Sequence, residues 1–343
     1  MGWYSAVGRP LFFALPPETA HRLAGAMLGL PLPWARIGHA ADDPSLGTTL
    51  AGLPLRNPIG LAAGFDKTCV HLDALSALGF GYVVGGTITR APRAGNGKPR
   101  IVRYPARASM ANAMGLPNPG AERAAAALVR RERPVGTRLV SVADEAVEDA
   151  LAGFSLLEPH ADAVELNASC PNVSWGRDRD NEAHLRELVT EMRVRSTKPL
   201  FVKLPPFTTS VERDVVLALA SIAQDSGASG LTCSNTRPVH EARLSVGGGG
   251  LSGRALWERT PSIVAEVRTV TGGAMAINAC GGISTADEVL ACLEAGATTV
   301  QVYSALIYEG PGIVGALTHG LLRALRTRHT SVGALAGTAE SAA

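Results

Sequence analysis

The residues from 165 to 172, Glu-Leu-Asn-Ala-Ser-Cys-Pro-Asn, place a thiol between two carboxamides at the end of a β-rich run. A cysteine thiol has an ordinary pKa of about 8.5, so a modest shift would make Cys170 a usable general base near neutral pH. The side chains of Asn167 and Asn172 offer uncharged donors and acceptors, which suit a planar ring with alternating C=O and N–H groups. The alternative interpretation is that Cys170 is a buried packing residue.

Two lysines also follow β-rich runs. Lys203 could form a Schiff base with a carbonyl substrate, or place a fixed positive charge beside an electron-rich ring. Lys67 ends the run Leu-Ala-Ala-Gly-Phe-Asp-Lys, whose small residues would let a flat ring approach the backbone. We expect Lys67 to pair with a substrate carboxylate; the alternative is a solvated lysine in a plain turn.

The last two β-rich runs carry the pairs Gly281-Gly282 and Tyr303-Ser304. In an eight-stranded α/β barrel, this end of the sheet commonly binds phosphate through backbone N–H groups. The sequence therefore predicts a phosphorylated cofactor. The glycine run 247–250 is interpreted as a flexible loop.

Eight β-rich runs alternate with segments that can each hold a helix, which predicts a (β/α)8 TIM barrel with its chemistry at the carboxyl ends of the strands. A doubly wound sheet is the alternative. Thr285 and Glu288 match a capping box. The runs are 57–64, 81–88, 138–142, 163–169, 199–205, 230–236, 275–282 and 298–306, and the clearest helices are 182–195, 211–226, 260–270 and 285–295.

We expect a helical extension over residues 1–40, the barrel over 41–328 and a disordered tail over 329–343, which is rich in Ala, Gly, Ser and Thr. In the extension, apolar residues recur at the helical spacing of i, i+3, i+4, i+7 and i+8. Such a face could pack on the barrel or lie in a membrane interface. The residues concerned are Ala20, Leu23, Ala24, Met27 and Leu28.

The bulk composition excludes several classes of protein. The net charge is only +2, which gives no reason to expect a nucleic-acid partner. The five cysteines are scattered and lack a C-x-x-C pair, so neither a disulfide framework nor a metal site is predicted. No apolar run reaches the roughly 18–20 residues of a membrane span, and the start does not resemble a signal peptide. We expect a cytoplasmic protein, peripheral on the inner face of the cell membrane.

Taken together, these segments resemble the dihydroorotate dehydrogenases over nearly the whole chain. The resemblance implies oxidation of dihydroorotate to orotate in pyrimidine biosynthesis, with Cys170 as the base and FMN across the barrel mouth. The matching runs are NPIGLAAGFDK (57–67), GTIT (86–89), PRIVR (99–103), NAMGLPN (112–118), NASCPN (167–172), VKLPP (202–206), SNT (234–236), GGLSGR (249–254) and QVYSAL (301–306).

The resemblance also implies two sets of binding residues. Those matching FMN positions are Ala63, Gly64, Lys67, Thr87, Ser141, Asn167, Lys203, Ser234, Gly253, Gly282, Tyr303 and Ser304; Ser141 stands where membrane-associated relatives have an asparagine. Those matching substrate positions are Lys67, Asn112, Ala113, Met114, Gly115, Leu116, Asn167, Asn172, Asn235 and Thr236.

The motifs combine two classes of the family. A cysteine base is typical of the soluble class 1 enzymes, whereas the N-terminal extension is typical of the membrane-associated class 2 enzymes, which reduce quinone. His21, Arg103 and Tyr303 match positions lining the class 2 quinone tunnel. Because the base does not determine what reoxidises the flavin, we expect quinone as the acceptor, with fumarate, NAD or oxygen as alternatives. Deleting residues 1–37 should then abolish quinone reduction and leave the dihydroorotate half-reaction intact. The oligomeric state stays open, since class 1 relatives form dimers and class 2 relatives are often monomers.

Three other functions are compatible with parts of this pattern. A related flavoprotein could act on an uncarboxylated dihydropyrimidine, which would not need Lys67. An aldolase or isomerase could use Lys203 as a Schiff base and would contain no flavin. A non-catalytic flavin-binding relative would not need Cys170.

Overall fold

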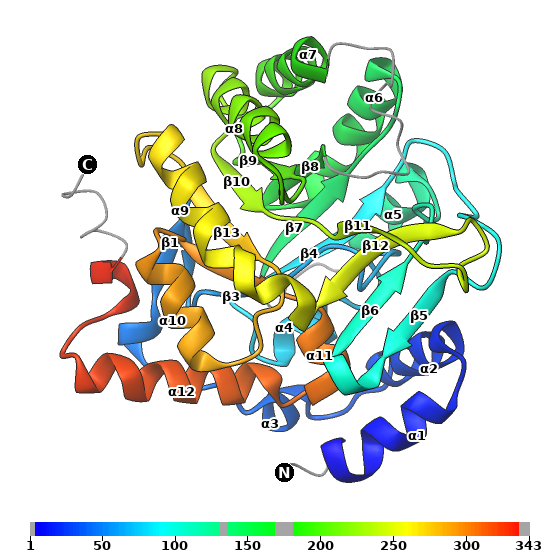
Figure 1. Ribbon diagram of the computed structural model, residues 1–343, viewed down its shortest axis with the longest axis vertical. Helices are drawn as coiled ribbons and strands as arrows, with labels where there is room; N and C mark the ends of the chain where they lie inside the picture. The colour runs from blue at the N-terminus through cyan, green and yellow to red at the C-terminus, as the bar shows by residue number, and fades with distance from the viewer. Residues whose placement is uncertain (1–3, 130–135, 169–180, 336–343) are drawn as a thin grey trace.

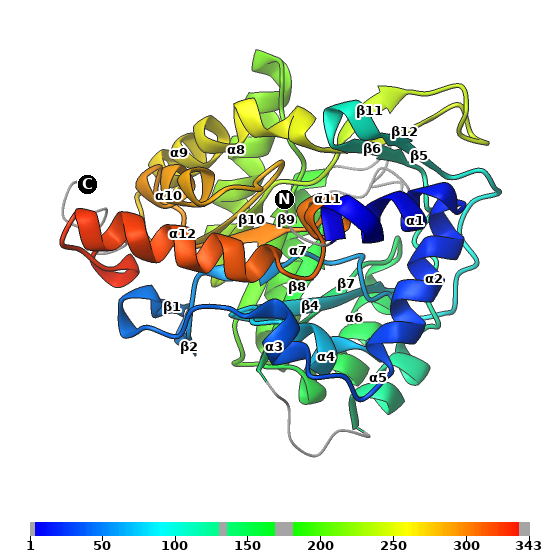
Figure 2. The same ribbon diagram turned by 90° about the horizontal axis from the view of Figure 1, so that it is seen from below.

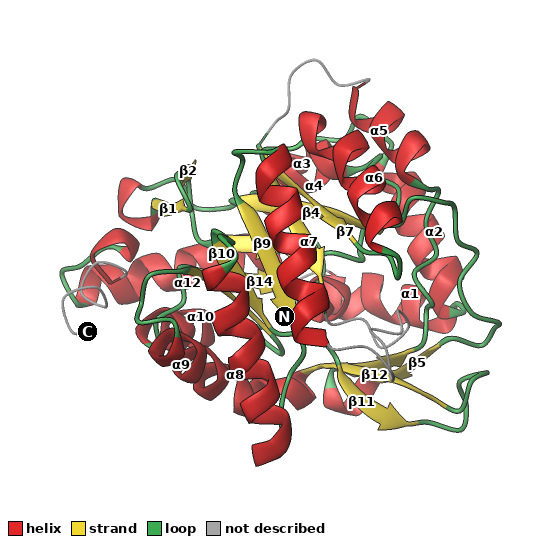
Figure 3. Ribbon diagram, turned by 90° about the horizontal axis from the view of Figure 1, so that it is seen from above, coloured by secondary structure: helices red, strands yellow, loops and turns green. Residues whose placement is uncertain are grey.

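The computed structural model describes residues 4–129, 136–168 and 181–335. Its centre is a closed barrel of eight parallel strands, each paired with its neighbours along the chain, and helices surround it (Figure 3). This confirms the predicted (β/α)8 fold. In order around the barrel the strands are β3 (Ile59–Leu61), β4 (Tyr82–Ile88), β7 (Thr137–Val142), β8 (Ala163–Asn167), β9 (Leu200–Leu204), β10 (Gly230–Cys233), β13 (Ala276–Cys280) and β14 (Thr299–Val302).

The barrel strands are buried on both faces because helices cover the outside. The predicted capping box is present, with Thr285 Oγ1 accepting from the Glu288 amide at 3.3 Å. Thr209 and Glu212 form a second one that was not predicted. The helices of the barrel are α4 (Leu72–Ala77), α5 (Ala121–Val129), α6 (Val147–Leu157), α7 (Asn181–Arg195), α8 (Ser210–Asp225), α9 (Thr260–Val270), α10 (Ala286–Glu294), α11 (Ser304–Glu309) and α12 (Ile313–Thr327).

In the described part of the N-terminal extension, a π-helical turn (Tyr4–Gly8) precedes the α-helices α1 (Arg9–Ala14), α2 (Pro17–Leu28) and α3 (Trp34–Gly38). Figures 1 and 2 show α1 and α2 as a pair on one side of the barrel, beside β5 (Ile101–Tyr104). Arg103 on β5 holds this pair, because its guanidinium donates to the carbonyls of Phe12, Phe13 and Leu15 at 3.2–3.4 Å. The extension is therefore anchored by partly buried hydrogen bonds between its backbone and the Arg103 side chain.

Two small sheets close the barrel at its ends. The hairpin of β1 (Thr48–Leu50) and β2 (Leu53–Leu55) buries Leu50 and Leu55 against Tyr82 and Phe201. At the opposite end lies a sheet in the order β11 (Arg237–His240), β12 (Gly248–Gly253), β6 (Ser109–Asn112) and β5. The interpretation of the glycine run as a flexible loop was therefore wrong.

Close backbone approach explains the glycines of β12. A Cβ on Gly249 would lie 2.4 Å from the carbonyl oxygen of Asn112, and one on Gly250 would lie 2.0 Å from the Thr236 hydroxyl. Glycine is thus required for packing here rather than for freedom of movement.

The start of the tail packs on the body of the protein. Residues 332–335 form a helical turn, and Val332 is completely buried in the main core. The predicted disorder from residue 329 is therefore wrong for this stretch, because one apolar side chain finds a site between elements that are distant in sequence. Residues 336–343 lie outside the described residues.

Replacing Gly60 with alanine is expected to destabilise the barrel by about 1–3 kcal/mol through overpacking. A Cβ there would lie 2.3 Å from the ring of Tyr82, which is fully buried and hydrogen-bonded to Thr299 at 2.8 Å. Urea unfolding measures the change. Gly153→Ala is the control. Gly153 lies within α6, and a Cβ there would meet its nearest neighbouring atoms at 3.6 Å and beyond, which is ordinary van der Waals contact. A helix propensity gain of about 0.5–1 kcal/mol is expected there; equal destabilisation by both substitutions would contradict the argument.

Candidate active site

A cavity of about 980 Å³ lies over the carboxyl ends of the barrel strands and extends to α1 and α2. Side chains from the barrel, from β6 and from the extension line one continuous space. The predicted site residues that line it are Ala63, Gly64, Lys67, Thr87, Asn112, Met114, Leu116, Asn167, Lys203, Ser234, Asn235, Thr236, Gly253, Gly282, Tyr303 and Ser304, together with His21 and Arg103.

A chain of polar side chains crosses the floor of this cavity. Thr87 Oγ1 lies 3.0 Å from Ser141 Oγ and accepts from Asn167 Nδ2 at 3.0 Å. Asn167 Oδ1 in turn accepts from Asn235 Nδ2 at 3.5 Å. These residues end β4, β7 and β8 or follow β10, so their closeness follows from the parallel arrangement of the strands. These hydrogen bonds orient the carboxamides of Asn167 and Asn235 on the cavity wall.

Ser141 does not line the cavity. It is completely buried, behind Thr87. Its hydroxyl lies 3.0 Å from that of Thr87, and its predicted contact with a cofactor stays a prediction. Ala113 and Gly115 also stay out of the lining, although Met114 and Leu116 beside them contribute to it.

Lys203 forms a buried ion pair with Glu165. The two side chains are 6% and 0% exposed, and Lys203 Nζ lies 3.9 Å from Glu165 Oε1. The other carboxylate oxygen accepts from Thr232 Oγ1 at 2.8 Å and from Gln301 Nε2 at 3.4 Å. Burial by itself would lower the pKa of Lys203, but the charges of Glu165 and Cys280 together outweigh it and raise that pKa above its usual value. Lys203 is therefore a fixed positive charge in the cavity floor.

Lys67 is a second cation in the cavity. Its Nζ donates to the carbonyl oxygen of Gly64 at 2.5 Å, and Tyr303 OH donates to the same oxygen at 3.2 Å. Burial lowers the pKa of Lys67 to about 8, although the nearby Asp66 acts in the opposite direction. An anion binding beside Lys67 would favour the charged form, so this lysine is suited to bind a carboxylate.

Three glycines form the wall at the far end of the barrel mouth. Gly253, Gly281 and Gly282 all have positive φ, at 88°, 150° and 73°. A Cβ on Gly282 would lie 2.6 Å from the amide nitrogen of Trp257. Glycine is therefore required at position 282 because its backbone packs directly against that of Trp257. All three glycines line the cavity, where backbone N–H groups can bind an anionic group.

Aromatic side chains line the passage between the barrel and the extension. Phe65 packs edge-on between His21 and Tyr303, with ring centroids 5.4 and 5.9 Å away. Burial, followed by the charge of Lys67, lowers the pKa of His21 to about 4, so its imidazole is neutral at physiological pH. Arg103 stacks on Phe13 at 4.6 Å. The passage is thus mainly apolar with a few polar groups.

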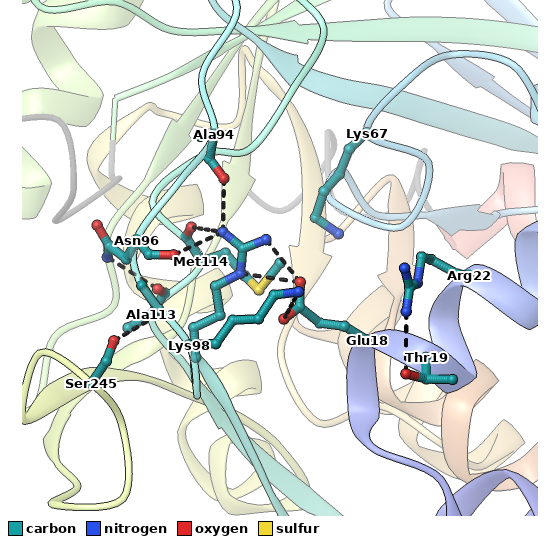
Figure 4. A network of polar contacts seen from close by, with 12 residues as sticks. Glu18, Thr19, Arg22, Lys67, Ala94, Asn96, Lys98, Ala113, Met114 and Ser245 are labelled. Atoms are coloured by element: carbon teal, nitrogen blue, oxygen red, sulfur yellow. Dashed lines mark hydrogen bonds and ion pairs between the residues drawn. The ribbon is translucent and has the colours of Figure 1, made fainter.

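Cys170 and Asn172 lie outside the described residues, so their predicted roles stay predictions. Sequence reasoning missed Glu165 as the partner of Lys203, although it lies in the quoted run 165–172. It also missed the pair of Glu18 and Arg100, whose guanidinium also donates to the carbonyl of Met114. Figure 4 shows Glu18 and Met114 in this network of polar contacts. Both pairs involve charged residues that are nearly buried, and no local sequence pattern reveals burial of this kind.

Among the described residues, the helices are too short or too polar to cross a membrane.

Comparison with known proteins gives consistent matches over almost the full chain. A sequence model of the family described as Dihydroorotate dehydrogenase matches residues 45–325. The chain is 38% identical to a dihydroorotate dehydrogenase (quinone) from Rhodospirillum rubrum, over 94% of this chain and 91% of the relative. It is 39% identical to one from an Anaeromyxobacter species, over 96% and 97%.

Solved structures agree. DHODH from Eimeria tenella in complex with ferulenol superposes with a TM-score of 0.79 at 29% identity, covering 93% of this chain and 94% of that one. The ligand-free form from the same organism gives a TM-score of 0.80 at 28% identity, covering 93% and 99%. With the barrel and its polar floor, these matches show that the chain belongs to the dihydroorotate dehydrogenase family.

Proposed function

We propose that this protein oxidises dihydroorotate to orotate in pyrimidine biosynthesis, with FMN as its cofactor and a quinone as the electron acceptor. The observation that carries the proposal is the single cavity in which Lys67, Lys203 and the carboxamides of Asn112, Asn167 and Asn235 meet the apolar passage to the extension. Relatives that match nearly the whole chain carry the name dihydroorotate dehydrogenase (quinone).

The residues present fit FMN. The glycine wall of Gly253 and Gly282 would receive the phosphate, because both glycines line the cavity and backbone N–H groups suit an anion. Thr87, Asn167 and Lys203 would face the polar edge of the ring, since donors and a fixed positive charge suit its oxygens and nitrogens. When bound, FMN would supply the two-electron chemistry that takes hydride from the substrate and passes electrons to the acceptor.

The chain's own residues would bind the substrate and move its proton. Lys67 would pair with the substrate carboxylate, and the carboxamides of Asn112, Asn167, Asn172 and Asn235 would hold its ring. Cys170 would remove the proton from C5, which lies next to a carbonyl and is acidic only towards a base held in line with it. Of these groups, the hydrogen-bonded floor holds Asn167 and Asn235 in place.

The extension would give a quinone access from a membrane. Among residues 4–32, its surface bears six exposed large apolar side chains, although such side chains are normally buried. They are Val7 (58%), Leu11 (66%), Leu23 (45%), Met27 (37%), Leu30 (51%) and Leu32 (39%). Leu23 and Met27 belong to the face that the sequence singled out, and they point to solvent. These side chains support peripheral contact with the membrane surface.

Anaerobic flavin reduction tests this function directly. We expect dihydroorotate to bleach the flavin absorbance of the purified protein, and a quinone analogue to restore it. Recovery with fumarate but not with quinone would instead assign a soluble acceptor. A flavin that stays oxidised with dihydroorotate would refute the substrate assignment and direct the search to uncarboxylated dihydropyrimidines.

Replacing Arg103 with leucine is expected to raise the KM for quinone at least about tenfold. The substitution removes donors from three carbonyls around the end of α1, and hydrogen bonds to a charged group are worth about 1.5–3 kcal/mol each. Steady-state kinetics with a quinone analogue measures the effect, and stopped-flow flavin reduction by dihydroorotate should stay unchanged. Arg36→Leu, at an exposed position on α3, is the matched control. Equal effects of both substitutions would contradict a specific role for Arg103.

A further inference from the structure

We infer that Glu18, on α2 of the N-terminal extension, is a positioning residue for the substrate and acts through Arg100 on the segment 112–116. The inference rests on the proposed function, because it takes this segment as part of the dihydroorotate site. It assigns to the extension a role in the first half-reaction as well as in quinone access.

Arg100 joins α2 to the barrel by hydrogen bonds in two directions (Figure 4). On one side, its Nε and one terminal nitrogen donate to Glu18 Oε1 at 3.1 and 2.8 Å. On the other side, the second terminal nitrogen donates to the carbonyls of Ala94 and Asn96 at 2.8 and 3.0 Å, and to that of Met114 at 3.5 Å. A planar guanidinium with five donors is suited to this bridging role.

The same stretch of backbone holds the segment 112–116. The amide of Ala113 donates to the carbonyl of Arg100 at 2.9 Å, and the amide of Asn96 donates to the carbonyl of Met114 at 3.0 Å. The side chain of Asn96 also donates to the carbonyl of Ala113 at 3.0 Å. The position of Met114 and Leu116 on the cavity wall therefore depends on where Arg100 and Asn96 lie.

Arg100 requires its carboxylate partner because it is almost buried. Its side chain is 10% exposed, whereas that of Glu18 is 24% exposed and that of Lys98, the other cation near Glu18, is 64% exposed. Burial favours neutral Glu18, but the hydrogen bonds and charge of Arg100 outweigh it and hold the pKa of Glu18 below its usual value. A nearly buried guanidinium that loses its partner is costly, so Arg100 would move towards solvent.

Two consequences follow. Deleting residues 1–37 removes Glu18, so we expect weaker binding of dihydroorotate, whereas the sequence predicted an intact first half-reaction. Since coupling between two sites is reciprocal, orotate in the cavity should also strengthen the docking of α2 on the barrel.

The test uses the FMN-loaded, full-length protein and Glu18→Ala. We expect the Kd for orotate, measured from its perturbation of the flavin spectrum, and the KM for dihydroorotate to rise together by about 2- to 30-fold, the usual range for coupling through a contact network. The kcat at saturating dihydroorotate and the FMN content should stay at wild-type values. Glu18→Gln, which keeps an acceptor for Arg100 without the charge, should give a smaller rise.

Lys98→Gln is the matched control. Lys98 Nζ also faces Glu18, at 3.7 Å, but the carbonyls of Ala94, Asn96 and Met114 are bound by Arg100 instead. Its orotate affinity should equal that of the wild type. A comparable rise in Lys98→Gln would overturn the inference, because general electrostatics would then explain both variants.

Hydrogen exchange gives a readout independent of turnover. In Glu18→Ala, the amides of 112–116 should exchange faster, and orotate should slow exchange in α2 of the wild type. If Glu18→Ala leaves both the orotate affinity and the exchange in 112–116 unchanged, the inference is overturned and the proposed function is unaffected. A wild-type protein that is not reduced by dihydroorotate and does not bind orotate would overturn the proposed function, and the inference with it.

Discussion

Replacing Glu165 with glutamine is expected to lower the free energy of unfolding by about 3–5 kcal/mol, the usual cost of breaking a buried ion pair from one side. Glu165 has no exposed surface, and Lys203 has almost none, so the remaining ammonium charge could not be hydrated. Glutamine keeps the shape and can still accept from Thr232, which confines the change to the charge. Urea unfolding of wild type and variant, both without added cofactor, measures the difference.

The pH dependence of this difference identifies its cause. In the wild type, the pKa of Lys203 is raised, so the pair contributes stability that is complete below the ordinary lysine pKa of about 10.4 and is lost above the raised value. In the variant, burial alone lowers this pKa, so stability rises as the pH approaches 10. The difference in free energy of unfolding between wild type and variant should therefore be largest near neutral pH and become smaller towards pH 10.

A double variant is the control for the ion pair. Glu165→Gln combined with Lys203→Met removes both charges, and buried pairs replaced in this way often cost little. We expect it to be more stable than Glu165→Gln alone at neutral pH. A double variant that is less stable than the single one, together with a difference between wild type and Glu165→Gln that is independent of pH, would contradict the assignment of Lys203 as a charge held by Glu165.

Replacing Cys170 with alanine is expected to slow flavin reduction by dihydroorotate by about 10²- to 10⁴-fold, the usual contribution of a positioned general base. The prediction rests on the proposed function and on the place of Cys170 between Asn167 and Asn172 in the sequence. Anaerobic stopped-flow spectroscopy measures the rate. The Kd for orotate should change little, because the carboxamides and Lys67 supply the binding contacts.

The serine variant of Cys170 separates a base from a packing residue. The pKa of a serine hydroxyl is much higher than that of a cysteine thiol. Cys170→Ser should therefore keep part of the activity, with its pH optimum moved upward. An alanine variant with wild-type rates, or a serine variant with an unchanged pH profile, would show that another group removes the proton.

The order of β-rich and helix-forming segments is enough to predict the barrel and the end of it that carries the site. Eight β-rich runs separated by helix-forming segments can bury their apolar residues in few other ways, and parallel strands bring their carboxyl ends together. For this reason the ends of the strands place Lys67, Asn167 and Lys203, which are distant in the chain, at one site. Thr87 and Asn235 were assigned to that site only through the resemblance to the family. Most predicted runs extended past the strands, because at the carboxyl ends the chain leaves the sheet to form the site; the run 298–306, for example, covers both β14 and the start of α11.

The packing and charge partners of these residues depend on contacts between elements that are distant in the chain. Ser141 lies behind Thr87 rather than in the cavity, and the glycines of β12 serve close packing in a sheet. Glu165 balances Lys203 from the neighbouring strand, and Glu18 holds Arg100 from 82 residues away. Local pattern specifies which residue types end a strand, but burial and charge pairing depend on which elements meet. Contacts between distant elements determine whether a buried charge has a partner, and a buried charge without one is costly. No single segment of the chain contains both sides of such a contact.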